Sequence, residues 1–126
     1  MKKVNKEELA KIVEKHGKWL RGEDGGERAD LRYVDLTGED LHGLDLRCGR
    51  LSGARLVRAS LRGAELFQAD MACSDMAGAD LSGADLSGAD LRRADLRGAN
   101  LTEADLSWAD LSEAKLDGAI MDGAID

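Results

Sequence analysis

The chain has no proline and few aromatic residues: two Trp, one Tyr and one Phe among 126 residues. So few aromatic side chains exclude the stacking platforms that bind single-stranded nucleic acid. No stretch is long enough or apolar enough to span a membrane, and no signal peptide opens the chain. We therefore expect a cytoplasmic protein without a membrane span that does not bind nucleic acid directly.

Catalytic and metal-binding patterns are also missing. The two cysteines, Cys48 and Cys73, form no Cys-x-x-Cys pair, and no histidine spacing suggests zinc. The serines have no histidine near them in sequence, and the glycines form no phosphate-binding loop that opens a helix. We therefore expect no enzymatic activity, no catalytic residue, no cofactor and no metal.

A five-residue pattern dominates the chain from Ala29 to its last residue. Leu or Met occupies every fifth position from Leu31 to Met121, nineteen times in a row. A typical stretch is Ala79-Asp80-Leu81-Ser82-Gly83, with Ala two positions before the Leu and, in ten repeats, Gly two positions after it. A fixed short period of this kind indicates a solenoid.

Neither a helix nor a flat strand satisfies this period. Leucines five apart would spiral around a helix and form no apolar face, and in a strand Leu31 and Leu36 would face opposite sides. The pattern is satisfied if the chain bends once per repeat, so that every Ala and Leu points toward one axis. Gly then occupies the corner, where a turn needs a positive φ, and Asp bonds local backbone.

This pattern resembles the pentapeptide repeat family, whose unit is Ala-(Asp/Asn)-Leu-x-x, over residues 29–126. The resemblance implies an all-β solenoid, a right-handed quadrilateral β-helix with four repeats per coil and about five coils. Glu39 departs from the pattern at a position that should be buried, so we expect a loosened first coil there or a cation against Glu39. Cys48 and Cys73 differ by one coil plus one face, so we expect two free thiols.

Residues 1–28 precede the repeats and predict one capping α-helix followed by a glycine-rich link. Asn5 and Glu8 form an N-terminal capping box. The apolar face expected to cover the first coil consists of Leu9, Ile12, Val13, Trp19 and Leu20. His16 lies on the same face, where we interpret it as packed or rim-exposed. A helix that binds a membrane surface or a partner is the alternative.

Charge is uneven along the repeats. On a twenty-residue coil, Arg50 falls between Asp30 and Asp70, which predicts an arginine belt between acidic coils. The belt consists of Arg47, Arg50, Arg55, Arg58 and Arg62. It either neutralises repulsion within the stack or binds an anionic partner.

The remaining acidic residues form columns on the same register. The predicted acidic faces consist of Asp70, Asp75, Asp85, Asp90, Asp95, Asp105 and Asp110. Some members of the family that confer fluoroquinolone resistance resemble B-form DNA and bind DNA gyrase or topoisomerase IV. This chain lacks the interrupting loop and the C-terminal dimerising helix of those inhibitors, and Asp is the ordinary family choice at this position.

The last repeats carry apolar residues at outward positions. Ile120 and Ile125 replace the usual Asp, and Trp108 lies near the same rim. An apolar rim on an open β edge predicts an end-to-end homodimer through Trp108, Ile120, Met121 and Ile125, with a frayed monomer as the alternative. The leading hypothesis is a non-catalytic structural or protein-interaction module with an unassigned partner. A DNA-mimicking binder of a type II topoisomerase is the alternative.

Overall fold

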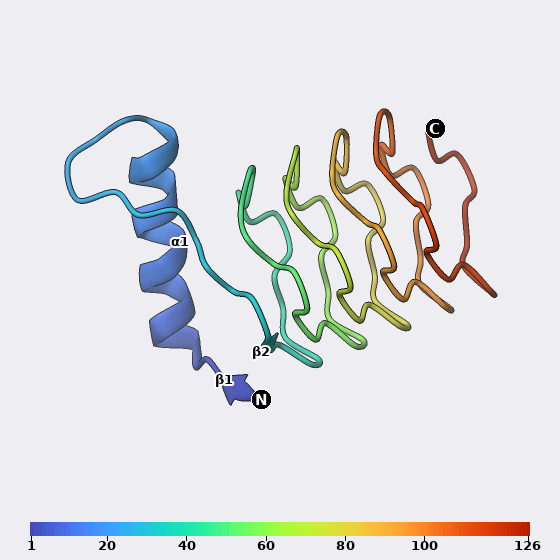
Figure 1. Cartoon of the computed structure of the whole chain (residues 1–126), viewed down its shortest axis with the longest axis horizontal. Helices are drawn as coiled ribbons and strands as arrows, with labels where there is room; N and C mark the ends of the chain where they lie inside the picture. The colour runs from blue at the N-terminus through green and yellow to red at the C-terminus, as the bar shows by residue number, and fades with distance from the viewer.

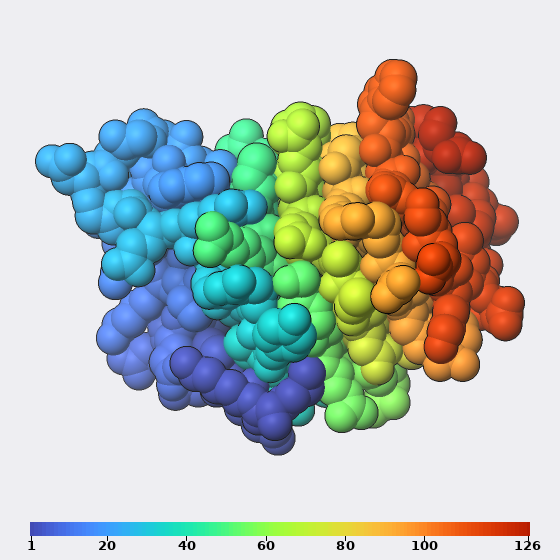
Figure 2. All heavy atoms as spheres, viewed as in Figure 1, coloured from blue at the N-terminus to red at the C-terminus, as the bar shows by residue number.

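The computed structural model describes all 126 residues and contains one helix, α1 (Lys6–Leu20), and two short strands, β1 (Lys2–Lys3) and β2 (Val34–Asp35). Beyond α1 the chain winds into a stack of coils, with α1 at one end and the C-terminus at the other (Figure 1). In the space-filling view the coils form successive bands along the molecule (Figure 2). The helix α1 is too short and too polar for a membrane span.

The coils stack in a twenty-residue register. Asp30 pairs in parallel with Arg50, and Arg50 pairs with Asp70. The Leu31 N–H donates to the Arg50 carbonyl at 2.8 Å, and the Arg50 N–H donates to the Ala29 carbonyl at 3.0 Å. Since a repeat has five residues and the register is twenty, each coil holds four repeats and presents four faces. The first coil comprises residues 29–48.

Each face ends in a tight turn with a left-handed residue. In the turn after Leu51, the Ala54 N–H donates to the Leu51 carbonyl at 3.0 Å, and Gly53 has a φ of 67°. Nine repeats place a residue other than glycine at this corner, at a cost of about 1–2 kcal/mol each. They are Tyr33, Cys48, Arg58, Gln68, Cys73, Arg93, Glu103, Trp108 and Glu113.

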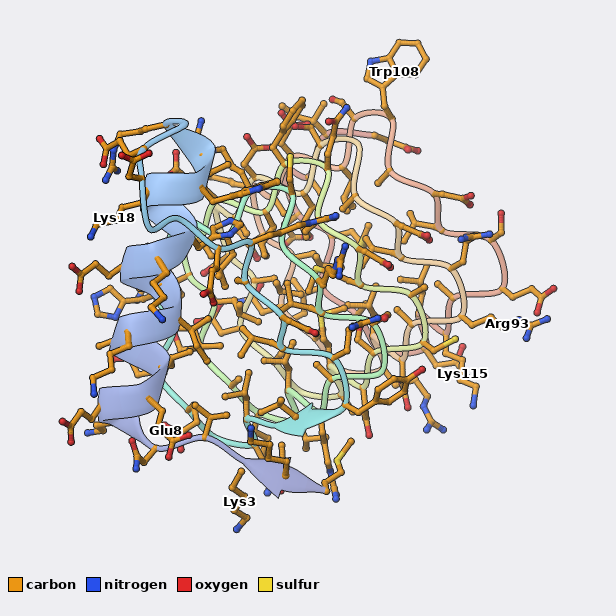
Figure 3. All side chains as sticks on the ribbon, turned by 60° about the vertical axis from the view of Figure 1, so that its left-hand side comes forward. Lys3, Glu8, Lys18, Arg93, Trp108 and Lys115 are labelled. Atoms are coloured by element: carbon orange, nitrogen blue, oxygen red, sulfur yellow. The ribbon has the colours of Figure 1, made fainter.

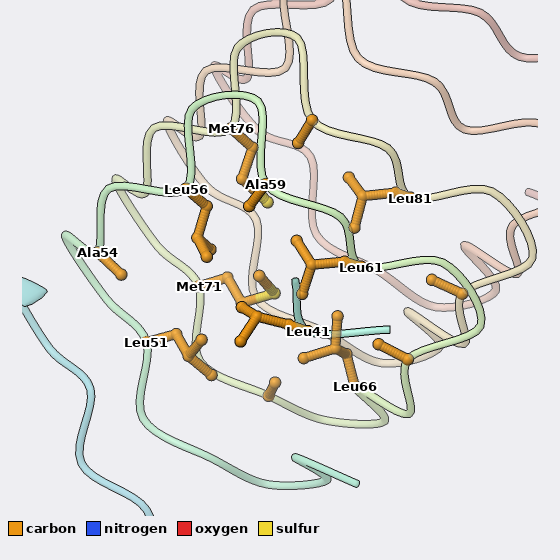
Figure 4. Packing of buried hydrophobic residues seen from close by; sticks show 14 of the residues in the cluster. Leu41, Leu51, Ala54, Leu56, Ala59, Leu61, Leu66, Met71, Met76 and Leu81 are labelled. Atoms are coloured by element: carbon orange, nitrogen blue, oxygen red, sulfur yellow. The ribbon is translucent and has the colours of Figure 1, made fainter. Parts of the chain in front are cut away.

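The core is a single column of inward-pointing side chains. Leu51, Leu56 and Leu61 converge on the axis of one coil (Figure 4) and are 0% exposed. The column loosens at the C-terminal end, where Leu116 is 37% and Met121 40% exposed because no further coil covers them. Burial therefore stabilises the middle of the stack more than its last coil.

Helix α1 begins at a capped turn and lies against the first coil. The Asn5 side chain accepts a hydrogen bond from the Glu8 N–H at 2.8 Å. Leu9 is buried, and Ile12 and Val13 pack against the core column. Of the remaining residues of the predicted face, Trp19 is 39% exposed and Leu20 is half-buried.

The strand β1 was not predicted from the sequence. It pairs in parallel with β2, with Lys2 opposite Val34 and Lys3 opposite Asp35. This pairing brings Val4 into the core, where it is 7% exposed. The first residues therefore add one more parallel strand to the stack on one face of the solenoid.

The expectation for Glu39 was wrong in both its forms. The first coil is not loosened there, since the Glu39 N–H donates to the Leu36 carbonyl at 3.1 Å and the Glu39 carbonyl accepts from Ser60 at 2.9 Å. No ion pair to Glu39 forms within 4.0 Å. The side chain is half-buried and lines two open hollows beside α1, because no earlier coil covers this position.

Candidate functional site

The outward aspartates hold the turns in place. The Asp80 Oδ1 accepts from the Ser82 N–H at 3.0 Å and from the Ser82 hydroxyl at 2.6 Å. The same bond from the backbone two residues later recurs at Asp70, where Ala72 supplies only its N–H. These carboxylates therefore have a structural role before any functional one.

Several aspartates also pair with an arginine two residues later. The Arg92 Nε donates to Asp90 Oδ1 at 2.9 Å and its Nη2 to Asp90 Oδ2 at 2.7 Å. Arg97 binds Asp95 in the same way. These bonds lower the pKa of Asp90 and of Asp95 below the ordinary aspartate value. Two of the predicted acidic columns are therefore interrupted by cations.

The predicted arginine belt divides into paired and stacked residues. Arg47 forms a two-bond pair with Asp45 within its own repeat. Arg50 and Arg55 lie in columns between aspartates of adjacent coils. Arg62 approaches Asp80 only at 4.0 Å, and Arg58 occupies an exposed corner with a φ of 55°. The belt thus crosses all four faces and forms no compact basic patch.

The seven predicted acidic residues fall into three columns on three faces. One column is Asp70, Asp90 and Asp110, the second is Asp75 and Asp95, and the third is Asp85 and Asp105. The first two columns contain the pairs with Arg92 and Arg97. Only the third has no basic partner, which distinguishes its face from the others.

This third face combines carboxylates with exposed aromatic rings. It consists of three stacked repeats, each taken with the corner residue before it: residues 63–68, 83–88 and 103–108. These segments contain no Lys or Arg. Its acidic residues are Glu65, Asp85, Glu103 and Asp105. We name these three repeats the acidic–aromatic face. Sequence analysis had not identified Glu65, Phe67 or Glu103 as part of a site, although comparison of positions twenty apart would have shown the absence of bases.

The two aromatic residues of this face lie at its opposite ends. Phe67 is 40% exposed, and Trp108 is 93% exposed at a corner with a φ of 63°. The Trp108 ring projects away from the coils into solvent (Figure 3). An exposed indole on a strained corner is unfavourable in the isolated chain on two counts, and such residues are typical of binding surfaces.

The carboxylates between these rings are spaced along the stack axis. Glu65 pairs with Asp85 and Asp85 with Asp105 across adjacent coils, so successive acids are about 4.8 Å apart, the spacing of hydrogen-bonded strands. Hydrogen bonds from Ser107 lower the pKa of Asp105. The face therefore presents a line of carboxylates along the stack axis.

The hollows of the surface are open and polar. The largest, about 640 Å³, is lined by Asp40, His42, Ser60, Arg62, Gly63 and Ser82. One of about 570 Å³ lies where the N-terminal segment meets the first two coils. No three His, Cys, Asp or Glu side chains are grouped to hold a metal ion, and Cys48 and Cys73 are free thiols.

The residues of the predicted dimer interface lie together at the C-terminal end. Ile120 pairs with Asn100, and Ile125 with Asp105. Ile120 is 46%, Met121 40% and Ile125 56% exposed. Trp108 occupies the last corner of the preceding coil, so it belongs to the acidic–aromatic face and also borders this rim.

Comparisons with known proteins agree with this architecture. The family model described as pentapeptide repeats matches residues 27–63, 50–88, 59–98 and 89–125. A crystal structure of a pentapeptide repeat protein from the Arabidopsis thaliana thylakoid lumen has 37% sequence identity and a TM-score of 0.72, covering 75% of this chain and 66% of that protein. No curated protein sequence matches the chain.

A second similar structure is QnrB1, a plasmid-mediated fluoroquinolone resistance protein. It has 20% sequence identity and a TM-score of 0.52, and the match covers 79% of this chain and 51% of that one. This chain thus spans about half to two thirds of the length of the two structures. At this identity the likeness to QnrB1 concerns the fold alone.

Proposed function

The chain belongs to the pentapeptide repeat family, and from this premise we propose that it is a non-catalytic solenoid that binds a basic segment of a protein partner. The family and the similar structures support a right-handed β-helix. The binding surface in this proposal is the acidic–aromatic face. The observation that carries it is the combination of an unneutralised acidic column with the exposed ring of Trp108.

The chemistry of this face fits lysine and arginine side chains. Carboxylates in adjacent coils pair with cations at regular intervals, and the indole of Trp108 offers a face for a cation–π contact, worth about 0.5–1 kcal/mol at an exposed site. On this face only the first coil carries an arginine, Arg47, which pairs with Asp45, whereas the other three faces also carry arginines in the later coils. A basic partner is therefore attracted more strongly to this side of the solenoid than to faces whose aspartates pair with arginines.

A peptide titration tests this proposal. The probe is octa-arginine, followed by ¹H–¹⁵N NMR at low salt, and octa-glutamate is the control peptide. We expect shifts confined to residues 63–68, 83–88 and 103–108, including the Trp108 indole N–H. Shifts spread equally over all four faces, or an equal response to octa-glutamate, contradict the proposal.

Matched variants sharpen the test. Asp85→Asn with Asp105→Asn removes two charges from the face but keeps the oxygen that accepts the turn hydrogen bond. We expect an increase in Kd of about tenfold, which corresponds to about 1.4 kcal/mol. Asp75→Asn with Asp95→Asn is the control on another face, and its Kd should change by less than about twofold. Equal losses in the two pairs exclude the acidic–aromatic face as the site.

The alternative function, DNA mimicry toward a type II topoisomerase, rests on the same negative charge. The pairs Arg92–Asp90 and Arg97–Asp95 argue against DNA mimicry, since they interrupt two of the three acidic columns. A gyrase supercoiling assay with titrated protein distinguishes the two proposals. Inhibition at micromolar concentration supports mimicry, and no inhibition removes it.

We also propose a homodimer through the C-terminal rim. The exposed side chains of Ile120, Met121 and Ile125 support it, since apolar side chains beside an open β edge favour burial against another copy. Sedimentation of the wild type and of Ile120→Asp with Ile125→Asp tests it. We expect dimers only in the wild type, and a monomeric wild type at tens of micromolar overturns the dimer.

The N-terminal segment has a protective role in this proposal. Residues 1–28, with β1 and α1, form a cap over the first coil, and residues 29–126 form the solenoid of about five coils, about 24 Å long at about 4.8 Å per coil. The burial of Val4 and Leu9 supports the cap. The cytoplasmic location stays a prediction, which imaging of a tagged protein in its native cell tests.

A further inference from the structure

His16 is fully buried between α1 and the solenoid, although the proposed function does not use it. Its side chain is 0% exposed. The Ala29 N–H donates to Nδ1 at 2.9 Å, and Nε2 lies 2.7 Å from the Arg47 carbonyl oxygen. One imidazole thus joins α1 to both the first residue and the last face of the first coil.

These two contacts require one protonation state. A backbone N–H only donates, so Nδ1 must be an unprotonated acceptor, and a carbonyl only accepts, so Nε2 must carry the hydrogen. A second proton on Nδ1 would place two N–H groups against each other. It would also leave the buried Ala29 N–H without an acceptor and bring a charge into the interface.

The groups around the ring cannot replace the lost bond. The Trp19 ring stacks on His16 with centroids 5.5 Å apart, and Arg28 lies 5.6 Å from the Trp19 ring while its Nε donates to the carbonyl of Cys48. The carboxylate of Asp45 is the nearby anion, and both of its oxygens bind Arg47. Asp45 can attract a charged imidazole, but in the structure its oxygens accept from Arg47 and not from the Ala29 N–H.

We propose that His16 is a proton-sensitive latch, in which the neutral ring holds α1 against the first coil and a second proton releases it. Histidine changes charge between about pH 5 and 8. Mild acid therefore weakens the attachment of α1 while the solenoid stays folded. Detachment uncovers Leu9 and the backbone edge of the first coil, where another β segment can pair.

Hydrogen exchange tests the latch in the full chain. We expect the protection factors of the α1 amides, corrected for the intrinsic effect of pH, to fall about tenfold from pH 7.5 to pH 5.5. Amides in the middle coils, such as those of Leu81 and Leu86, should not change. Protection of α1 that does not depend on pH overturns the proposal.

Two variants separate the latch from other effects of acid. His16→Gln keeps an acceptor for Ala29 and a donor for Arg47 but does not titrate, so its α1 protection should be the same at both pH values. His42→Gln removes the exposed histidine bound to Asp40 and should behave as the wild type. Retention of the pH response in His16→Gln contradicts the latch.

A measurement on the wild type keeps the proposal testable if His16→Gln does not fold. The Hε1 chemical shift of His16 and the amide chemical shifts of α1 should titrate with one midpoint. The Hε1 of His42 serves as the internal reference. Two different midpoints for His16 and α1 overturn the proposal.

Discussion

The ring of Tyr33 lies against Gly53 of the second coil so closely that a Cβ on Gly53 would overlap Tyr33 Cε1. Both residues are corners with positive φ, 60° and 67°. Gly53→Ala must therefore displace the ring and also strain its own backbone. We expect a loss of about 1–3 kcal/mol in the free energy of unfolding, measured by urea denaturation.

The matched control is Gly83→Ala. Its φ is 66°, and an added Cβ meets nothing within 4 Å, so only the backbone strain of about 1 kcal/mol applies. In a Tyr33→Ala background the excess cost of Gly53→Ala should disappear. Equal losses for the two glycine variants in the wild-type background refute the steric relationship.

Substitution of Trp108 tests whether this residue lowers the stability of the fold but strengthens binding. Trp108→Gly relieves a positive φ and removes an exposed indole, so we expect stability to rise by about 0.5–1 kcal/mol while octa-arginine binding weakens several-fold. Urea denaturation and peptide titration measure the two effects. Arg58→Gly, another exposed corner, should also stabilise but leave binding unchanged. A destabilised Trp108→Gly chain would show that the ring packs within the fold.

The core column predicts a gradient of mutational cost along the stack. Leu81 is 0% exposed and Leu116 is 37% exposed. We expect Leu81→Ala to cost about 3–5 kcal/mol and Leu116→Ala less than about 2 kcal/mol. Chemical denaturation of the two variants measures this difference. The gradient applies to the monomer, so the costs are measured at nanomolar concentration, where similar costs contradict the prediction. At higher concentration the proposed dimer covers the last coil and should raise the cost of Leu116→Ala.

Acid should destabilise the solenoid through its turn carboxylates. Hydrogen bonds from Arg32 lower the pKa of Asp30 to about 2, and bonds from Ser112 lower that of Asp110. A lowered folded pKa stabilises the fold above the unfolded value of about 4, and this stabilisation is lost as pH falls through the folded value. The free energy of unfolding should therefore decline from about pH 4 toward pH 2.

Urea denaturation at pH 5, 4 and 3 measures this decline. Asp30 and Arg32 are about half exposed, so added salt should reduce the contribution of their charges. Arg32→Ala should make the acid decline shallower, whereas Arg50→Ala, which forms no ion pair within 4.0 Å in the structure, should alter it less. An acid decline unchanged by Arg32→Ala rules out this pair as a cause.

The five-residue period predicted the core and the turns because each repeat forms the same turn and points the same two positions inward. The Leu and Met side chains at every fifth position from Leu31 to Leu101 are 0% exposed, and the corners Gly38 and Gly53 have positive φ. The resemblance to the family supplied four repeats per coil, and the parallel pairing of Asp30 with Arg50 agrees with it. Residues that follow the period are predictable here because they pack against the equivalent residues of neighbouring repeats.

Irregular residues were harder to predict because their partners are backbone groups or lie nearby in sequence. Val4 enters the core through a two-residue strand that has no periodic signal. His16 binds the backbone of Ala29 and Arg47, which no side-chain pattern reveals. The pairing of Arg92 with Asp90 required comparison of positions two apart, whereas the arginine belt had been analysed only on the register of twenty.

The two periods of the molecule, five for the core and twenty for the ladder, have different consequences for changes in length. Removal of five residues from the middle keeps every Leu on the axis but turns all later residues by a quarter of a coil. Asp105 would then stack on a different column, and the acidic–aromatic face would be cut in two. Removal of twenty residues keeps both the axis and the columns. Insertions and deletions are therefore neutral for the fold in steps of five, but they preserve the surface only in steps of twenty.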